Sequence, residues 1–191
     1  MRNRELTKTI LLSLATAGMI AVAATSPYFL INIAREIKRN RKYIQKKLRN
    51  QFKERNIAKA LKRLKENRLI ILTEKDGKFK IELTEKGKRK VKEIQFLNMK
   101  VEKPEAWDKK WRIVIFDIPD KYKKRARDAL REKLKELEFY QLQKSVWVHP
   151  YPCEKEIQFL CELFDITPFV NIIEANNVYN DIKLKKYFGL F

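Results

Sequence analysis

The sequence has few of the side chains from which disulfides and thiol–imidazole metal sites are built. Its 191 residues include two cysteines and one histidine. Cys153 and Cys161 fall on one predicted helix, where their spacing places them roughly 12 Å apart, too far for a disulfide within that helix. A single histidine also excludes a Cys/His metal cluster. Two reduced cysteines, with Cys161 in the core, are typical of a cytoplasmic protein.

Acidic side chains are scarce in one third of the chain, and this scarcity sets the net charge. Residues 1–34 carry three basic and one acidic side chain, residues 35–100 carry 24 and 8, and residues 101–191 carry 17 and 15. The middle segment therefore supplies +16 of the net +20. A solvated surface does not explain so unbalanced a segment. We expect a polyanionic partner, with nucleic acid favoured over an anionic membrane.

Charge is absent from residues 9–34, and three interpretations of this segment compete. Basic residues before it and small residues at 21–23 resemble a signal peptide. Its length, counted over residues 10–31, suits a membrane anchor, which would keep the basic remainder in the cytoplasm. The third interpretation is one or two short buried helices, broken near residues 25–27. We favour the buried helices because the next segment needs a covering helix to close its own core, so a membrane partner is not expected.

Residues 54–68 form a predicted amphipathic helix. Ile57, Leu61 and Leu64 share one face of this helix. Four basic residues lie on or beside the opposite face: Arg55, Lys59, Lys62 and Arg63. On an isolated helix we would interpret such a face as solvated surface, but the segment that follows favours a functional interpretation.

A hairpin is predicted directly after this helix. Residues 69–73 form a strand, and Asp76-Gly77 is a strong turn signal. The return strand alternates apolar and charged residues, Phe79, Ile81 and Leu83 with Lys78, Lys80 and Glu82. Thr84 then caps a helix that runs to about residue 96. A helix followed by a two-stranded wing and a second helix resembles a winged helix-turn-helix domain, with the helix 54–68 in the major groove and the wing against the phosphates.

The second half of the chain has a different pattern. Residues 97–110 form a predicted linker anchored by Trp107, and residues 113–116 are an unbroken apolar run typical of a central strand. Asp120 is a predicted N-cap for the helix that follows. Strand signals between residues 140 and 148, with a turn at Gln143-Lys144, precede a helix over residues 153–164 and a strand over residues 169–175. This order is the βαββαβ of a ferredoxin-like sandwich.

The combination resembles the PaaX-type transcriptional regulators, whose central domain is similar to the small ferredoxin-like subunit of CRISPR adaptation complexes. The resemblance covers about residues 53–178 and is carried by Trp111, the run Phe116-Asp117-Ile118-Pro119, Arg125, Leu130 and residues 143–148. It implies an α+β protein with a winged helix-turn-helix domain (residues 1–96), a linker (97–110), a ferredoxin-like domain (111–178) and a C-terminal helix or arm (179–191). The sequence lacks the large C-terminal domain of full-length PaaX regulators, so phenylacetyl-CoA sensing is not implied.

The favoured hypothesis is a cytoplasmic transcriptional repressor that binds double-stranded DNA specifically, without a cofactor. The resemblance implies a homodimer formed through the ferredoxin-like domain. Six residues are the expected DNA contacts: Arg55, Lys59, Lys62, Arg63, Lys78 and Lys80.

Two alternatives remain open. The first is a Mg²⁺-dependent nuclease, because Asp117 matches the strand-end aspartate that the CRISPR family is proposed to use. His149 would be its general base, although we interpret a histidine beside proline as an ordinary loop residue. The second is a membrane-tethered DNA-binding protein. We favour DNA binding because the nuclease has one candidate metal ligand per subunit, whereas the winged-helix pattern is complete.

Overall fold

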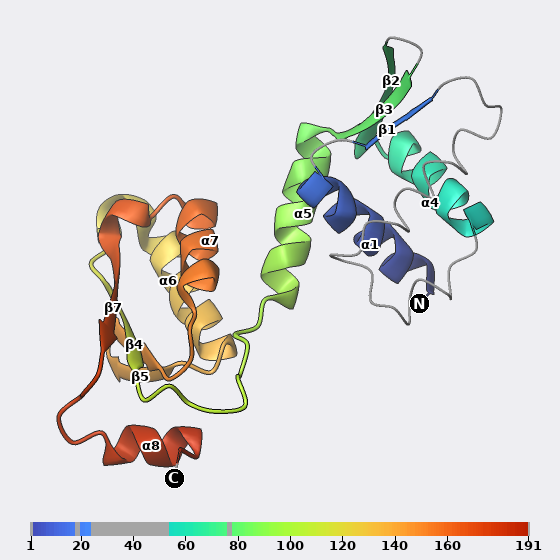
Figure 1. The fold of residues 1–191 in the computed structure, drawn as a ribbon. Helices are drawn as coiled ribbons and strands as arrows, with labels where there is room; N and C mark the ends of the chain where they lie inside the picture. Colours follow the sequence, from blue (N-terminus) through green and yellow to red (C-terminus); the bar gives the residue numbers. More distant parts are fainter. Residues whose placement is uncertain (1, 18–19, 24–53, 76–77, 191) are drawn as a thin grey trace. The chain divides into compact units, whose positions relative to one another are not determined.

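Two separate hydrophobic cores organise the chain, which divides into the units Met1–Leu97 and Asn98–Phe191 (Figure 1). The computed structural model describes residues 2–17, 20–23, 54–75 and 78–190. The first unit contains three described helices and three strands: α1 (Arg2–Ala17), β1 (Ile20–Ala23), α4 (Glu54–Glu66), β2 (Ile70–Lys75), β3 (Lys78–Leu83) and α5 (Glu85–Asn98). Its strands form an antiparallel sheet in the order β1-β3-β2.

Helix α1 supplies the centre of the first core. Leu6, Ile10, Leu11 and Leu14 are buried along one side of it, against residues of α4, β2, β3 and α5. The expectation of a buried helix in residues 9–34 is therefore confirmed for α1. No helix in the part of the chain that the structure describes is long and apolar enough to cross a membrane.

The expectation of helix is wrong for residues 20–23, which form β1. Ile20 lies opposite Ile81 of β3, and the antiparallel pairing gives the backbone of β1 its hydrogen-bond partners. A helix and a paired strand both provide hydrogen-bond partners for the backbone. Residues 20–23 form a strand here because the edge of β3 that β2 does not occupy is available for pairing. The predicted break near residues 25–27 lies outside the described residues, as does the predicted turn at Asp76-Gly77.

The second unit is the βαββαβ sandwich that the sequence predicts. It contains β4 (Trp111–Phe116), α6 (Asp120–Glu136), β5 (Tyr140–Gln143), β6 (Val146–His149), α7 (Glu154–Phe164), a short 3-10 turn (Thr167–Phe169) and β7 (Val170–Ala175). The antiparallel sheet has the order β5-β6-β4-β7, with α6 and α7 on one face (Figure 1). The apolar run of residues 113–116 lies in β4, which is a central strand as predicted. The hairpin turn falls at residues 144–145, one residue later than expected.

The start of α6 differs from the expectation that Asp120 is its N-cap. Pro119 is the N-cap residue, with φ −64° and an extended ψ of 132°. Its carbonyl accepts the N–H of Lys123 at 3.2 Å, which closes the first turn. Asp120 is therefore the first helical residue, because the proline ring already fixes the backbone angle needed at the entrance to the helix.

Three helices end on a left-handed residue that is not glycine. Arg68, Glu138 and Asp165 follow α4, α6 and α7 with φ of 56°, 64° and 54°. After each, the next N–H donates to a carbonyl five residues back at 2.9–3.0 Å, as Leu69 does to Leu64. Of the four described helices that end this way, only α8 (Ile182–Phe188) uses glycine, Gly189. The left-handed conformation costs a non-glycine residue about 1 kcal/mol.

The segment before β4 and the C-terminal arm both pack against the sheet. The Trp107 ring lies 4.8 Å from that of Trp111, and its indole N–H donates to the carbonyl of Lys110 at 3.0 Å, so Trp107 is the predicted anchor. Helix α8 buries Leu184 against Trp111 and Val148. The C-terminal arm therefore docks on the sheet of its own chain.

Candidate nucleic-acid interface

Helix α4 has one buried and one basic side. Ala60, Leu61 and Leu64 are buried in the first core, whereas Lys59, Lys62 and Arg63 are exposed. Three of the four cations predicted for this face are therefore exposed, and the fourth, Arg55, lies one turn before Lys59 on the same helix. The amphipathic period explains the arrangement, because the leucines turn inward at a spacing that leaves the basic residues outside.

The exposed cations of α4 have no acidic partner in the described part of the chain. Ion pairs there involve neither Lys59, Lys62 nor Arg63. Among the α4 residues whose side chains the structure describes, Glu66 is the one that is acidic. The contrast with α5 is clear, because two of its lysines are paired: Lys88 with Glu85 at 2.7 Å and Lys90 with Glu93 at 2.6 Å. Lys59, Lys62 and Arg63 are therefore both exposed and unpaired within the described part of the chain.

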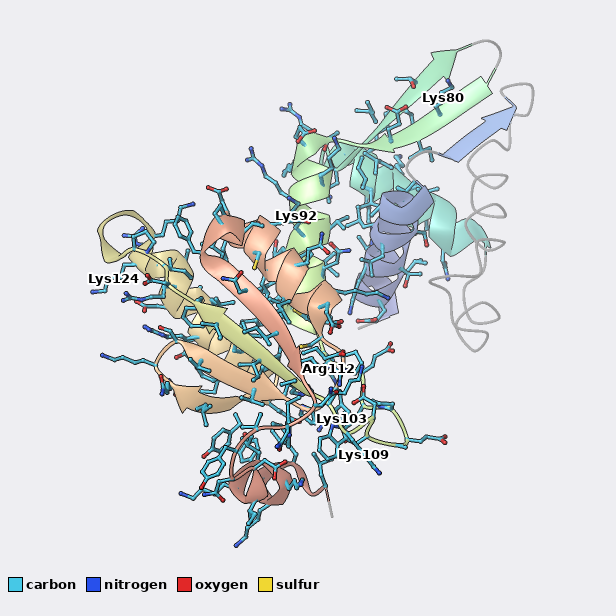
Figure 2. The ribbon with its side chains drawn as sticks, turned by 60° about the vertical axis from the view of Figure 1, so that its left-hand side comes forward. Lys80, Lys92, Lys103, Lys109, Arg112 and Lys124 are labelled. Carbon is cyan, nitrogen blue, oxygen red and sulfur yellow. The ribbon has the colours of Figure 1, made fainter. Side chains whose placement is uncertain are left out.

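Lys78 and Lys80 lie on β3, and Lys80 is on the sheet face that points away from the core. Ile81, between β1 and β2, is fully buried, so its neighbour Lys80 alternates to the outer face, opposite Thr73 and Ala21. Lys80 is half-buried at this position (Figure 2). Lys78 pairs in register with Lys75 of β2, which places two basic positions beside the hairpin turn.

Asp117 lies at the end of β4 with an exposed side chain. Its backbone N–H donates to the carbonyl of Phe169 at 3.0 Å, which ties the strand end to the segment before β7. Within the described ranges, no group of three or more His, Cys, Asp or Glu side chains is placed to hold a metal ion. Asp117 therefore belongs to no such group among the described residues.

His149 is the last residue of β6 and is 1% exposed, so its interpretation as a loop residue is wrong. Its ring lies 4.7 Å from that of Phe139 and 5.6 Å from that of Phe188, and Nδ1 accepts the N–H of Tyr151 at 3.2 Å. Burial lowers the pKa of the imidazole to about 4. His149 is therefore a neutral core residue at pH 7, enclosed by aromatic rings rather than presented to a substrate.

Both cysteines are free, as predicted, and both are buried, although the sequence analysis placed only Cys161 in the core. Burial raises the pKa of the Cys153 thiol to about 12 and that of Cys161 to about 11. Both thiols stay protonated at neutral pH, which makes them poor nucleophiles and poor metal ligands.

Arg112 is a buried cation that the sequence analysis did not single out. It is 3% exposed and donates to both carboxylate oxygens of Asp108 at 2.8 and 2.5 Å and to the carbonyl of Pro150 at 2.9 Å (Figure 2). The guanidinium holds the pKa of the Asp108 carboxyl below its usual value. The sequence did contain a signal for the burial of Arg112. It alternates with Val114 and Phe116 in β4, and these three residues share the face of the sheet that the helices cover.

Comparison with known families gives a match within the second unit. Residues 104–186 match the family model described as the PaaX protein central Cas2-like domain. The match runs from the segment before β4, through the whole sheet, into α8. No curated protein matches the chain.

Proposed function

We propose that this chain, which carries a PaaX-type central Cas2-like domain, is a transcriptional repressor that binds double-stranded DNA as a homodimer. The family match supports a transcriptional regulator. The observation that carries DNA binding is the exposed basic side of α4, where Lys59, Lys62 and Arg63 have no acidic partner among the described residues. A duplex offers closely spaced phosphates that can neutralise such a surface.

The first unit would bind DNA as a winged helix. Support comes from the order of its described elements, because α4 is followed by the β2–β3 hairpin and β1 pairs with the far edge of β3. In this proposal α4 lies in the major groove with Arg55, Lys59, Lys62 and Arg63 toward the bases and flanking phosphates. Lys78 and Lys80 of the hairpin contact the backbone. Phosphate contacts set the register, and contacts from α4 to base edges give specificity.

The second unit would form the dimer. Its sheet face opposite α6 and α7 is apolar, and α8 covers the end of this face around Trp111. Beyond α8, the pairing register places Ile113 and Ile115 of β4, Val146 of β6 and Ile173 of β7 on the same face. Ile173 is 46% exposed, and the other three are half-buried. A second copy would cover this strip and present two winged helices to a pseudo-palindromic site.

The test compares three full-length proteins in the same DNA-binding assay over a salt series, with Mg²⁺ present. They are the wild type, Lys59→Glu/Arg63→Glu, and a matched control, Lys124→Glu/Lys135→Glu, which makes the same charge change at exposed positions of α6. We expect binding to collapse in the α4 variant and to persist in the control. Equal losses in both variants would show that net charge, not α4, attracts the DNA.

A fourth protein, Asp117→Ala, tests the nuclease alternative in the same assay, because the side chain of Asp117 is exposed at the end of β4. Under the repressor proposal Asp117→Ala binds DNA as the wild type does, and the duplex remains intact with Mg²⁺. Cleavage that needs Mg²⁺ and disappears in Asp117→Ala would instead identify an endonuclease.

A further inference from the structure

The C-terminal end of α4 and the N-terminal end of α5 are joined by a dense group of hydrogen bonds, which we name the α4–α5 junction. The Thr84 hydroxyl donates to the carbonyl of Arg68 at 2.7 Å and accepts the N–H of Gly87 at 2.9 Å. The N–H of Thr84 donates to the carbonyl of Leu69 at 3.1 Å, and Lys86 Nζ donates to that of Asn67 at 3.1 Å. Three consecutive carbonyls that follow α4 are therefore bound by Thr84, directly before α5, and by Lys86 in its first turn.

Gly87 allows the two helix ends to approach this closely. It is buried in the first turn of α5, and a Cβ placed on it would lie 2.0 Å from the carbonyl oxygen of Leu69 and 3.2 Å from Leu83 Cδ2. The oxygen is backbone, so it cannot rotate away as the end of a flexible side chain can. Glycine inside a helix costs about 1 kcal/mol relative to alanine, so its use here is explained by the contact with Leu69.

The junction bears on the direction of α4 because it holds the backbone that leaves the C-terminal end of this helix, while Ala60, Leu61 and Leu64 hold the helix against the core. The 13 residues of α4 span about 20 Å, so a rotation of about 5° at the junction moves the far end by roughly 2 Å. Hydrogen bonds to base edges tolerate shifts of only about 0.5 Å, whereas attraction to phosphates acts over about 10 Å at 0.1 M salt. A small misalignment therefore removes sequence discrimination before it removes non-specific affinity.

We infer that Thr84 and Gly87 are positioning residues that set the angle of α4 for base readout, although neither is a DNA contact. This inference rests on the proposed DNA-binding function. The Thr84 hydroxyl is the central element, because one side chain bridges the end of α4, through the carbonyl of Arg68, and the start of α5, through the N–H of Gly87. Valine has the same shape without the hydroxyl, and serine retains the hydroxyl without the methyl group.

The experiment uses the full-length wild type, Thr84→Val, Thr84→Ser and Gly87→Ala. The probes are a 30-bp duplex enriched from a random library by the wild type and an unselected random duplex of equal length. Dissociation constants are measured by fluorescence anisotropy at 15 °C, with circular dichroism showing that each variant is folded. We expect Thr84→Val to weaken binding to the selected duplex about tenfold, because a misaligned α4 would lose about one hydrogen bond to a base edge. Binding to the random duplex should change little.

The remaining variants decide between positioning and mere stability. Thr84→Ser, which keeps the hydroxyl, should have nearly the wild-type ratio of the two dissociation constants. Gly87→Ala should lose more of this selectivity than Thr84→Val does, or it should fail to fold. A Thr84→Val protein that melts at a lower temperature but keeps the wild-type ratio of the two dissociation constants would overturn the inference while leaving the proposed function intact. A wild type that enriches no duplex would reject the proposed function itself, and this inference with it.

Discussion

The two units use their cations differently. Residues 1–97 carry 26 basic and 9 acidic side chains, a net charge of +17, whereas residues 98–191 carry 18 and 15, a net of +3. In the second unit, cations pair with acids distant in sequence: Lys103 with Glu138, Lys110 with Glu174 and Lys123 with Asp165. In the first unit, the described ion pairs are local and the basic side of α4 has none. The second unit therefore neutralises many of its cations within its own fold, whereas the exposed cations of α4 have no acidic partner among the described residues.

Neutralising the basic side of α4 should give the largest effect. Lys59→Ala/Lys62→Ala/Arg63→Ala removes six cations from a dimer, and each phosphate contact contributes about 0.9 to the slope of log K against log salt. We expect DNA affinity at 0.1 M salt to fall roughly 1,000-fold and the slope to fall by about 5. Lys124→Ala/Lys135→Ala/Lys155→Ala, three exposed lysines of the second unit, is the matched control. An unchanged salt slope in the α4 variant would contradict the view that the cations of α4, unlike those of the second unit, contact phosphates.

Removing the buried cation of the second unit should destabilise that unit alone. Arg112→Leu leaves the carbonyl of Pro150 without its donor and breaks the pair with Asp108, at a cost of roughly 3 kcal/mol. All three tryptophans, Trp107, Trp111 and Trp147, lie in the second unit, so urea unfolding followed by tryptophan fluorescence reports on it selectively.

DNA binding by the folded Arg112→Leu protein should match the wild type in the non-specific, random-duplex assay. A fluorescence midpoint unchanged from that of the wild type would show that the buried ion network contributes nothing to stability.

His149 should make the second unit sensitive to mild acid. Burial lowers its pKa to about 4, against 6.5 when exposed, so the unfolded chain binds one more proton between these values. The contribution of His149 to the free energy of unfolding is therefore fully present above pH 6.5 and is lost as the pH falls toward 4. The loss should be roughly 2 kcal/mol between pH 7 and pH 5. The carboxyls with lowered pKa, such as Asp108, lose their contribution at lower pH.

Because His149 is the one histidine in the chain, His149→Phe is a clean control. Its free energy of unfolding, measured by tryptophan fluorescence in urea, should vary little between pH 7 and pH 5. A wild type that is equally stable at both pH values would mean that His149 is not desolvated.

The smallest effects should come from the left-handed helix ends. Arg68→Gly after α4 relieves a positive φ, so it should add about 1 kcal/mol of stability. Glu138→Gly after α6 relieves a similar strain but also loses the ion pair with Lys103, so its gain in stability should be smaller. Circular dichroism follows the first variant and tryptophan fluorescence the second. Gly189→Ala is the opposite change, from glycine to a residue with a Cβ, and serves as a control. The Cβ would have open space around it, so any loss of stability reflects backbone strain at φ 66° alone.

Most of the second unit was predictable because its signals are local. The apolar run of residues 113–116, the helical stripe through Leu130 and Leu134, and the strand signals near residues 140–148 each follow from a period of two or of 3.6 residues. The resemblance to PaaX-type proteins in this half is matched by the family model at residues 104–186. The errors lie at element boundaries, such as the cap at Pro119 and the turn at residues 144–145.

The candidate interface was predictable only as a set of positions. The amphipathic period of α4 placed Lys59, Lys62 and Arg63 away from Leu61 and Leu64, and the structure shows them exposed. Their contact with DNA remains a prediction. Thr84 was expected only as a helix cap, because nothing local in the sequence indicates that its hydroxyl also reaches the carbonyl of Arg68, 16 residues away.

Composition and periodicity alone determined that positive charge is concentrated in the first half of the chain and that the second half is a ferredoxin-like sandwich, because both follow from residue type and near-neighbour spacing. Only the tertiary structure decided that residues 20–23 pair as a strand with β3, that Arg112 and His149 are buried, and that Gly87 admits the carbonyl of Leu69. Each of these depends on a contact between residues distant in sequence. Such a contact exists only once the folded chain brings its partner close enough to exclude water or complete a hydrogen bond.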